Sequence, residues 1–263
     1  MSLRCLAGLR HSLRRTLSLS AAPLLAATCV LVTAPWLAPR PASAIPEADA
    51  VKKLAVIPVY ILTDPKGVPL PIPREKTLIL PLFLDRSQAE LELAQFNKAN
   101  PNLKAQLLPV PLNVANERVE QLNKDLKNGT TLVAPLMARA QDREQAIAIL
   151  KKQGLTDKQI KEGLNTPVFF TKPFLTINTP EGPRGVFFFR YEDLQKALSG
   201  VQGATKLEPQ AADLTAALRE IIKAKDDVFV FFPTPDYFRL VQEQQKQQAG
   251  GSKAPAPAAP PKP

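Results

Sequence analysis

The sequence LAVIPVYIL occupies residues 54–62, near the start of the predicted fold. It is apolar and rich in β-branched residues, and such a run predicts a buried strand. DPKG follows at residues 64–67, with Pro and Gly in the positions that a tight turn favours, and TLILPLFL at residues 77–84 predicts a second strand. A strand, a tight turn and a second strand are therefore expected to open the fold.

A helix is expected directly after the second strand. Asp85 is its predicted N-cap, with Gln88 three residues later, and Asn100-Pro101 ends it. Hydrophobic spacing then predicts, in this order, a strand at 106–110, a helix at 113–126, a strand at 131–136 and a helix at 141–152.

The same order of elements is expected again in the second half of the chain. TPVFF at residues 166–170 takes the place of IPVY at 57–60, and TPEG at 179–182 repeats the turn. The remaining matches are a strand at 185–190, a helix at 191–198, Pro209 in the place of Pro111, a helix at 210–222, a strand at 227–232 and a helix that Thr234 opens. The sequence predicts an α/β fold with a mixed sheet, a two-lobed pseudo-twofold duplication of a strand-turn-strand-helix-strand-helix-strand-helix unit. A chance likeness between two α/β segments is the alternative.

Five segments follow from this pattern. Residues 45–153 form the first predicted repeat lobe and residues 166–243 the second. The linking segment at 154–165 contains Thr156 and Gln159, which predict a capping box at the start of a short helix. Residues 1–44 are interpreted as a cleaved signal peptide, and residues 244–263, rich in Gln, Ala and Pro, as a disordered tail.

The N-terminal segment has the three parts of a secretory signal peptide. Four arginines lie within residues 4–15, an uncharged stretch spans residues 17–37, and Ala42-Ser43-Ala44 matches a cleavage site. An N-terminal membrane anchor and a plastid transit peptide are the alternatives.

Cleavage would remove the side chains that catalysis and metal binding most often use. Residues 1–44 contain both cysteines, the single histidine and the single tryptophan. They also contain five arginines, so cleavage would lower the formal net charge from +10 to +5. A mature chain without Cys or His favours binding over catalysis, and no cofactor, metal site or nucleic-acid partner is predicted.

A hydrolase that uses paired carboxylates is the catalytic alternative. Three pairs could act as acid and base: Glu90 with Glu92, Glu117 with Glu120, and Asp226 with Asp227. Each pair is also explained as an exposed helix face or as the entry to a strand, and the chain has no phosphate-binding glycine motif. We therefore predict that the protein is not an enzyme.

Phenylalanine is concentrated in the second half, where ten of the twelve lie from Phe169 onward. Neighbouring residues of a strand point to opposite faces, so the strand with Phe187-Phe188-Phe189 must be covered on both faces. Core packing accounts for most of these rings, and the remaining aromatic surface predicts an apolar groove. The candidate peptide-binding residues are Tyr60, Phe83, Phe169, Phe170, Phe187 and Phe189.

Four stretches together resemble a known family. They are LAVIPVY at 54–60, LPLFLD at 80–85, TPVFF at 166–170 and VFFFRYEDL at 186–194. They are similar to the family of the twenty-two-kilodalton subunit of the chloroplast inner-envelope translocon (Tic), in its cyanobacterial form. The similarity runs from about Leu54 to Val241, and its motifs are structural rather than catalytic.

The resemblance implies a soluble chaperone-like protein that assists the transport of precursor proteins across an envelope and outer-membrane biogenesis. Such a protein would hold unfolded chains in apolar grooves without ATP. The implied compartment is the periplasm after signal cleavage, with the thylakoid lumen or the plastid intermembrane space as alternatives. The implied partners are unfolded precursor proteins and outer-membrane barrel-assembly or translocon proteins, with at most peripheral membrane contact. A stoichiometric adaptor or structural subunit of an envelope translocation assembly is the alternative function.

Overall fold

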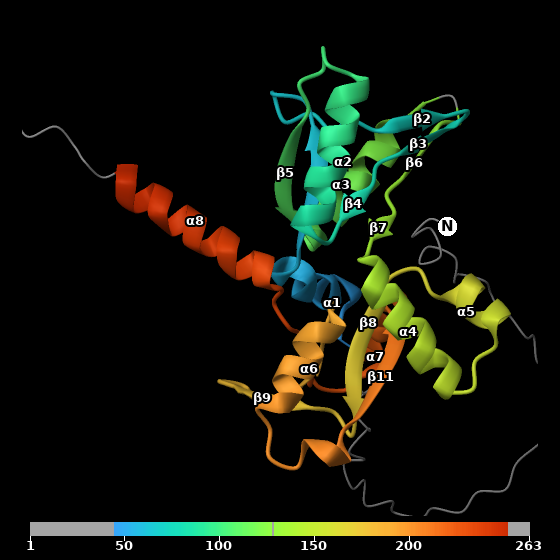
Figure 1. Ribbon diagram of the computed structural model, residues 1–263, viewed down its shortest axis with the longest axis vertical. Helices are drawn as coiled ribbons and strands as arrows, with labels where there is room; N and C mark the ends of the chain where they lie inside the picture. Colours follow the sequence, from blue (N-terminus) through green and yellow to red (C-terminus); the bar gives the residue numbers. More distant parts are fainter. Residues whose placement is uncertain (1–44, 128, 252–263) are drawn as a thin grey trace, which may run out of the picture.

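The computed structural model describes residues 45–127 and 129–251 of the chain. The predicted signal peptide and residues 252–263 of the predicted tail lie outside this part. Within it, no helix reaches the length and hydropathy needed to cross a bilayer. The described residues form two halves of helices and short strands, one above the other along the longest axis (Figure 1). The two halves meet around Asp85, Arg190 and Asp236, and we call this region the waist.

The first half contains a four-stranded mixed sheet. Helix α1 (Glu47–Lys52) and the 3-10 helix η2 (Lys53–Val56) lead into β1 (Pro58–Thr63), so the predicted strand begins at Pro58 rather than Leu54. β1 pairs antiparallel with β5 (Gln106–Pro111) and with β4 (Leu82–Phe83). β4 runs parallel to β7 (Leu136–Met137), which gives the strand order β5-β1-β4-β7.

A smaller three-stranded sheet lies beside it. β2 (Ile72–Arg74) pairs antiparallel with β3 (Thr77–Ile79), and β3 runs parallel to β6 (Thr131–Val133). The strands predicted at 77–84 and 131–136 are therefore each divided in two. Both divisions contain a proline, Pro81 and Pro135, and proline has no N–H to donate to a ladder.

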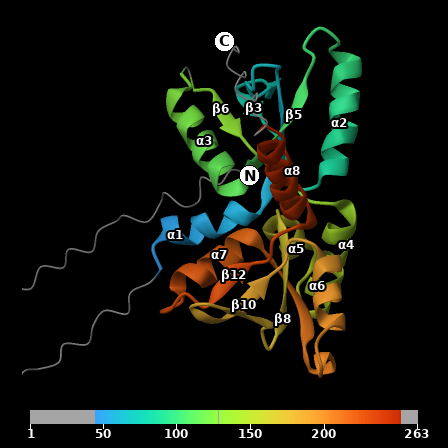
Figure 2. The same ribbon diagram turned by 90° about the vertical axis from the view of Figure 1, so that its left-hand side faces the viewer.

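The three long helices of the first half match their predictions. α2 (Arg86–Ala99) begins after Asp85, whose carboxylate accepts a hydrogen bond from the Gln88 N–H at 3.1 Å. α3 (Leu112–Asp125) and α4 (Ala140–Lys152) follow. α2 and α3 lie on opposite sides of the first-half strands (Figure 2).

The second half begins with α5 (Asp157–Gly163), where the predicted capping box of Thr156 and Gln159 is present. β8 (Pro167–Lys172) pairs antiparallel with β11 (Glu208–Asp213). β10 (Gly182–Phe187) pairs antiparallel with β9 (Thr176–Thr179) and parallel with β12 (Phe229–Phe231). The remaining elements are α6 (Tyr191–Ser199), the 3-10 helix η3 (Ala204–Lys206), α7 (Leu214–Lys223) and α8 (Pro235–Gly251).

The strand pairings of the first half recur in the second. β8 pairs with β11 as β1 pairs with β5, and β10 runs parallel to β12 as β3 runs parallel to β6. The helices do not all pack on their own half, however. α4, from the first half of the sequence, packs on β8 and β11 of the second half (Figure 1). The residue range 45–153 therefore does not form a separate body in space.

Two further predictions need correction. Residues 210–213 belong to β11 rather than to a helix, because pairing with β8 overrides the helix preference of Ala211 and Ala212, and α7 starts only after its N-cap Asp213. The predicted disordered tail starts at residue 244, but α8 continues to Gly251. Gln, Glu, Lys and Ala are good helix formers, so a segment with little apolar surface still extends a helix that an anchored first turn has started.

Three clusters of buried side chains form the interior. A central cluster is shared by both halves, with Ile57 and Leu112 from the first and Val168 and Ile221 from the second. A second cluster packs α4 and α5 on the far face of β8, and a third packs α2 on the far face of β1. Phe187 and Phe189 lie in the central cluster and Phe188 in the second, which confirms that this segment is covered on both faces.

Candidate functional site

The aromatic residues predicted to bind peptide are core residues. Five of the six, at positions 60, 83, 169, 187 and 189, are at most 4% exposed. The other, Phe170, is partly buried and stacks on Phe174 with a ring-centroid distance of 5.1 Å. The prediction that these rings line a groove is therefore wrong for the five buried residues. Both faces of each strand are covered, so the rings are buried in the core clusters.

A cavity of about 110 Å³ instead lies between α3 and the sheet formed by β1 and β5. We call it the α3 groove. Its walls are almost entirely aliphatic, with one ionisable side chain. The lining residues are Ile61, Thr63, Gly67, Pro69, Leu80, Leu108, Val110, Val114, Ala115, Arg118, Val119 and Leu122.

Helical and strand periodicity produce the two walls of the α3 groove. Val114, Arg118 and Leu122 are spaced four residues apart, so they follow one face of α3. Ile61 and Leu108 are opposite one another in the β1–β5 register, and side chains that are opposite in a ladder share one face of the sheet. The apolar face of α3 is therefore aligned with the apolar face of the two strands.

A tight turn forms one end of the α3 groove. Asp64 Oδ1 accepts hydrogen bonds from the N–H groups of Lys66 and Val68, both at 2.8 Å. Gly67 has a φ of +81°, a left-handed conformation that favours glycine. This turn places Gly67 and Pro69 at the rim of the cavity.

Aliphatic side chains remain exposed around the α3 groove. Leu108, Val114 and Leu122 line it with exposed fractions of 36%, 38% and 38%, and Val68 in the adjacent turn is 55% exposed. Large apolar side chains that gather at a concave surface are typical of a site that binds another chain or ligand.

The edge of β5 is unsuited to strand addition. Pro109 and Pro111 lie opposite Tyr60 and Pro58, and a proline cannot belong to a hydrogen-bonded pair of an antiparallel ladder. Hydrogen-bonded and non-hydrogen-bonded pairs alternate along β5, so the backbone positions whose N–H would point away from β1 are residues 107, 109 and 111. Residues 109 and 111 are proline and have no N–H. A chain bound at the α3 groove would therefore be held mainly by its side chains.

A wider, shallower cavity of about 500 Å³ lies on the second half. It involves the segment before β9 and the loop after α6. Phe174, Leu175 and Val201 line it together with polar side chains such as Gln202 and Lys206. Its lining mixes apolar and polar side chains, so it is less suited than the α3 groove to binding an apolar segment.

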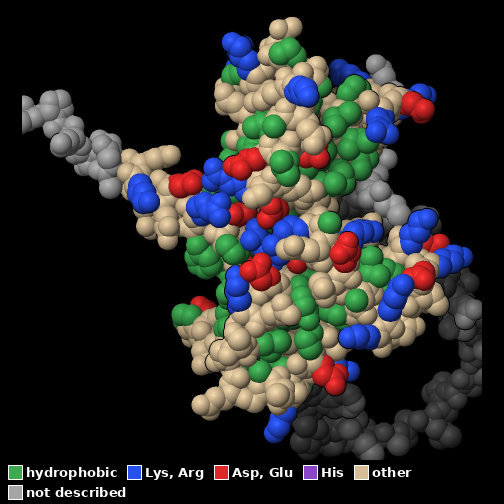
Figure 3. Space-filling model, in the orientation of Figure 1, with side chains coloured by type: hydrophobic (Ala, Val, Ile, Leu, Met, Phe, Trp, Pro, Cys, Tyr) green, Lys and Arg blue, Asp and Glu red, His purple; other side chains and the backbone are tan. Residues whose placement is uncertain are grey.

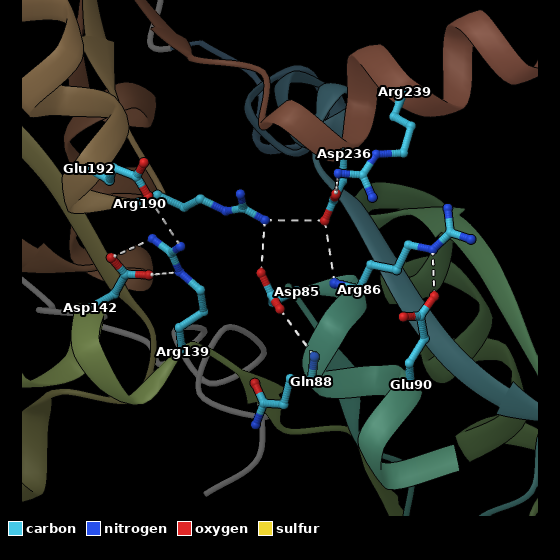
Figure 4. Close-up of polar contacts among 10 residues, drawn as sticks. All are labelled: Asp85, Arg86, Gln88, Glu90, Arg139, Asp142, Arg190, Glu192, Asp236 and Arg239. Atoms are coloured by element: carbon cyan, nitrogen blue, oxygen red, sulfur yellow. Dashed lines mark hydrogen bonds and ion pairs between the residues drawn. The ribbon is translucent and has the colours of Figure 1, made fainter. Parts of the chain in front are cut away.

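An ion-pair network joins the halves at the waist (Figure 4). The Arg190 guanidinium donates to Asp85 at 3.0 Å and to Asp236 at 3.2 Å. These three side chains are 13%, 16% and 4% exposed. Charged side chains also gather at the waist on the face that Figure 3 presents.

Two aspartates cap helices that lie in the other half of the sequence. Asp236 of α8 accepts a hydrogen bond from the Arg86 N–H at the start of α2, at 3.3 Å. Asp142 of α4 accepts one from the Tyr191 N–H at the start of α6, at 2.9 Å, and also binds Arg139 through both carboxylate oxygens. A carboxylate at a helix N-terminus satisfies free N–H groups and is favoured by the helix dipole.

Burial and charge shift the pKa of several groups near the waist. Burial, assisted by the negative charge of Asp236, raises the pKa of the Tyr60 hydroxyl to about 12. Burial also raises the pKa of Asp193. Burial acts to raise the pKa of Asp227 as well, but hydrogen bonds from Lys53 and Arg184 outweigh it and lower that pKa below its ordinary value.

The carboxylate pairs considered for catalysis have other roles. Glu90 forms an ion pair with Arg86, and Asp227 forms ion pairs with Lys53 and Arg184. Glu117 and Glu120 are exposed on α3. Within residues 45–127 and 129–251, no group of three or more His, Cys, Asp or Glu side chains is arranged to hold a metal ion.

The residues of the α3 groove were not identified from the sequence. The signal was present at Val114, Val119 and Leu122, because the apolar positions of α3 extend over a wider face than one core contact needs. The predicted binding residues are instead the aromatic residues of the strands, and most of these rings are buried.

Comparison with known proteins places the fold. No protein-family model matches the chain, and no curated protein matches it at a significant level of similarity. Among solved structures, Tic22 from Plasmodium falciparum matches with a TM-score of 0.59 and 20% identity, over 75% of this chain and 98% of that chain. Anabaena Tic22, a protein-transport protein, matches with a TM-score of 0.62 and 21% identity, over 82% of this chain and 100% of that chain. The resemblance noted in the sequence is thus confirmed at the level of the fold, and the protein has the fold of Tic22 proteins.

Proposed function

We propose that this protein takes part in protein transport as a chaperone-like protein that holds unfolded precursor proteins without ATP. The observation that carries the proposal is the α3 groove, a concave aliphatic surface whose walls include Leu108, Val114 and Leu122 in partly exposed positions. The shared fold with Anabaena Tic22, a protein-transport protein, supports the same role.

The chemistry of the α3 groove suits weak and broad binding. Apolar burial is non-directional, and burying one aliphatic side chain stabilises a complex by about 1.5–3 kcal/mol. A site of this kind would bind many unfolded sequences briefly and release them without an energy source. Several weak contacts along one unfolded chain would raise the overall affinity.

The compartment and the partners belong to the same proposal. The signal-like features of residues 1–44 support the periplasm, with the thylakoid lumen or the plastid intermembrane space as alternatives. A role in outer-membrane biogenesis would bring the protein into contact with barrel-assembly or translocon proteins. We also propose that the two halves arose by duplication, and the recurring strand pairings support this origin.

Light scattering tests the proposed function directly. A denatured outer-membrane barrel precursor is diluted into buffer with the purified protein, without nucleotide, and an inert protein of similar size serves as control. Suppressed aggregation at near-stoichiometric ratios is the expected result. Unchanged aggregation, with the protein folded and monodisperse, would contradict a holding role and favour an adaptor that docks a single folded partner.

A further inference from the structure

We infer that the α3 groove selects unfolded segments in which an aliphatic side chain is next to an acidic residue, and that Arg118 recognises the acid. This inference rests on the proposed function, because it names the class of segment that the groove would hold. In the part of the chain that the structure describes, Arg118 lines the groove and has no ion partner, and the cavity beside it is small.

Arg118 is the ionisable residue of the groove lining. It lies on α3 one turn after Val114 and one turn before Leu122, so its charge is flanked by exposed aliphatic groups on both sides. A segment that buries an aliphatic side chain in the cavity would therefore carry its neighbouring residues past the guanidinium.

The guanidinium of Arg118 has no ion pair or hydrogen bond to a protein group in residues 45–127 and 129–251. Nearby carboxylates are directed elsewhere. Asp64 accepts the N–H groups of its own turn, and Glu120 accepts from Asn116. An incoming carboxylate is therefore the complementary partner for Arg118.

The cavity volume favours aliphatic over aromatic side chains. About 110 Å³ is less than the roughly 150 Å³ of an apolar protein cavity that admits benzene. A single Val, Leu, Ile or Met side chain matches this volume more closely than the larger Trp side chain does. The C-terminal residues 252–263 of this chain contain two lysines and no acidic side chain, so they do not match a cationic groove.

Methyl NMR of the full protein tests the inference. The probes are blocked octapeptides of Gly and Ser with a single Leu followed by Glu, Gln or Lys, and a fourth peptide with Trp in place of Leu. Binding is followed at the methyl groups of Leu108, Val114 and Leu122. We expect the Leu-Glu peptide to bind about two- to fivefold more tightly than the Leu-Gln peptide, the range typical of an exposed ion pair. The Leu-Lys and Trp-Glu peptides should bind more weakly.

Substitutions at Arg118 and at a control position, Arg219, test whether Arg118 causes the preference for Glu. Arg118→Gln should remove the preference for Glu over Gln, and Arg118→Lys should retain part of it. Arg219→Gln makes the same charge change on α7, the corresponding helix of the second half, and should leave the preference intact. A preference that survives in Arg118→Gln, or shifts confined to methyl groups outside the groove, would overturn the inference.

The outcomes also separate this inference from the proposed function. If the protein suppresses aggregation but binds the Glu, Gln and Lys peptides equally, the selectivity is wrong and the holding role stands. If the peptide preference is found but aggregation is not suppressed, the holding role fails and the selectivity stands. Groove methyl shifts that appear when the protein alone is concentrated would identify a second copy as the occupant and overturn the inference.

Discussion

Arg190 and Asp85, which are 105 residues apart in sequence, form an ion pair of 3.0 Å across the waist. Each occupies the N-cap position of a helix in its own half, Arg190 before α6 and Asp85 before α2. A positive charge at a helix N-terminus is unfavourable, so Asp85 and Asp236 also offset the interaction of Arg190 with the α6 dipole. The waist is therefore a place where local helix capping and the docking of the two halves depend on the same side chains.

Removal of Arg190 should destabilise the fold strongly. Arg190→Met leaves Asp85 and Asp236 largely buried without their cation, and loss of one partner of a buried ion pair costs about 3–5 kcal/mol. Urea unfolding followed by circular dichroism measures the change. Lys223→Met, which breaks an exposed pair with Glu220, is the matched control and should change stability by less than about 0.5 kcal/mol. Equal effects of the two substitutions would show that the waist network does not hold the halves together.

The Asp227 ion pairs should give a pH-dependent contribution. The folded state lowers the pKa of Asp227, so its contribution is present above the ordinary aspartate pKa of about 3.9 and is lost as pH falls through the lower, folded value. Asp227 is 48% exposed, and solvent screening limits the contribution to about 1 kcal/mol. Asp227→Asn should therefore be less stable than the native protein at pH 6, and the difference should shrink as the pH is lowered from 4 toward 2. A stability difference that stays constant over this range would refute the assignment.

The buried aromatic residues should affect stability rather than binding. Phe169 is fully buried, so Phe169→Ala should lower the free energy of unfolding by about 3–5 kcal/mol. Phe238 on α8 is 49% exposed, and Phe238→Ala should cost less than about 1 kcal/mol. Denaturant titration distinguishes the two. A Phe169→Ala protein of native stability that had lost client binding would restore the groove role first predicted for this residue.

The α3 groove should account for client holding. Leu122→Ser removes an aliphatic side chain from the groove wall, and the loss of its burial against a client, about 1–2 kcal/mol, should weaken suppression of aggregation by roughly 5- to 30-fold. Leu91→Ser makes the same change at a position of α2 that is 66% exposed and outside the groove. Both variants should unfold at nearly the native temperature. Comparable loss of suppression in both would mean that clients bind elsewhere on the surface.

Pro109 should protect the edge of β5. Pro109→Ala restores an outward N–H next to that of Leu107 and makes the edge competent for strand pairing. We expect this variant to form dimers or larger species in sedimentation velocity at concentrations where the native protein is monomeric. Pro101→Ala, in the segment after α2, is a proline control away from the edge. A monomeric Pro109→Ala protein would show that the edge is protected by other means.

Local sequence patterns predict much of the secondary structure correctly. The Asp85 N-cap, the capping box of Thr156 and Gln159, and the turn at Asp64 depend on side chains that reach backbone groups within four residues. The order of strands and helices was also recovered because periodicity and turn residues act over short distances. The helix predicted at residue 210 was wrong for the opposite reason, since β11 exists only through its pairing with β8.

The candidate site depended on contacts that no local pattern encodes. Local sequence is enough to show which residues are apolar, where helices can start and that one segment carrying three phenylalanines must be buried on both faces. Long-range packing, which local patterns do not encode, buries those aromatic rings in the cores, lays α4 over the other half, and places Arg118 at an aliphatic cavity with no ion partner among the described residues. Burial is set by the competition among all apolar surfaces for the same interior, and that competition involves residues more than a hundred positions apart.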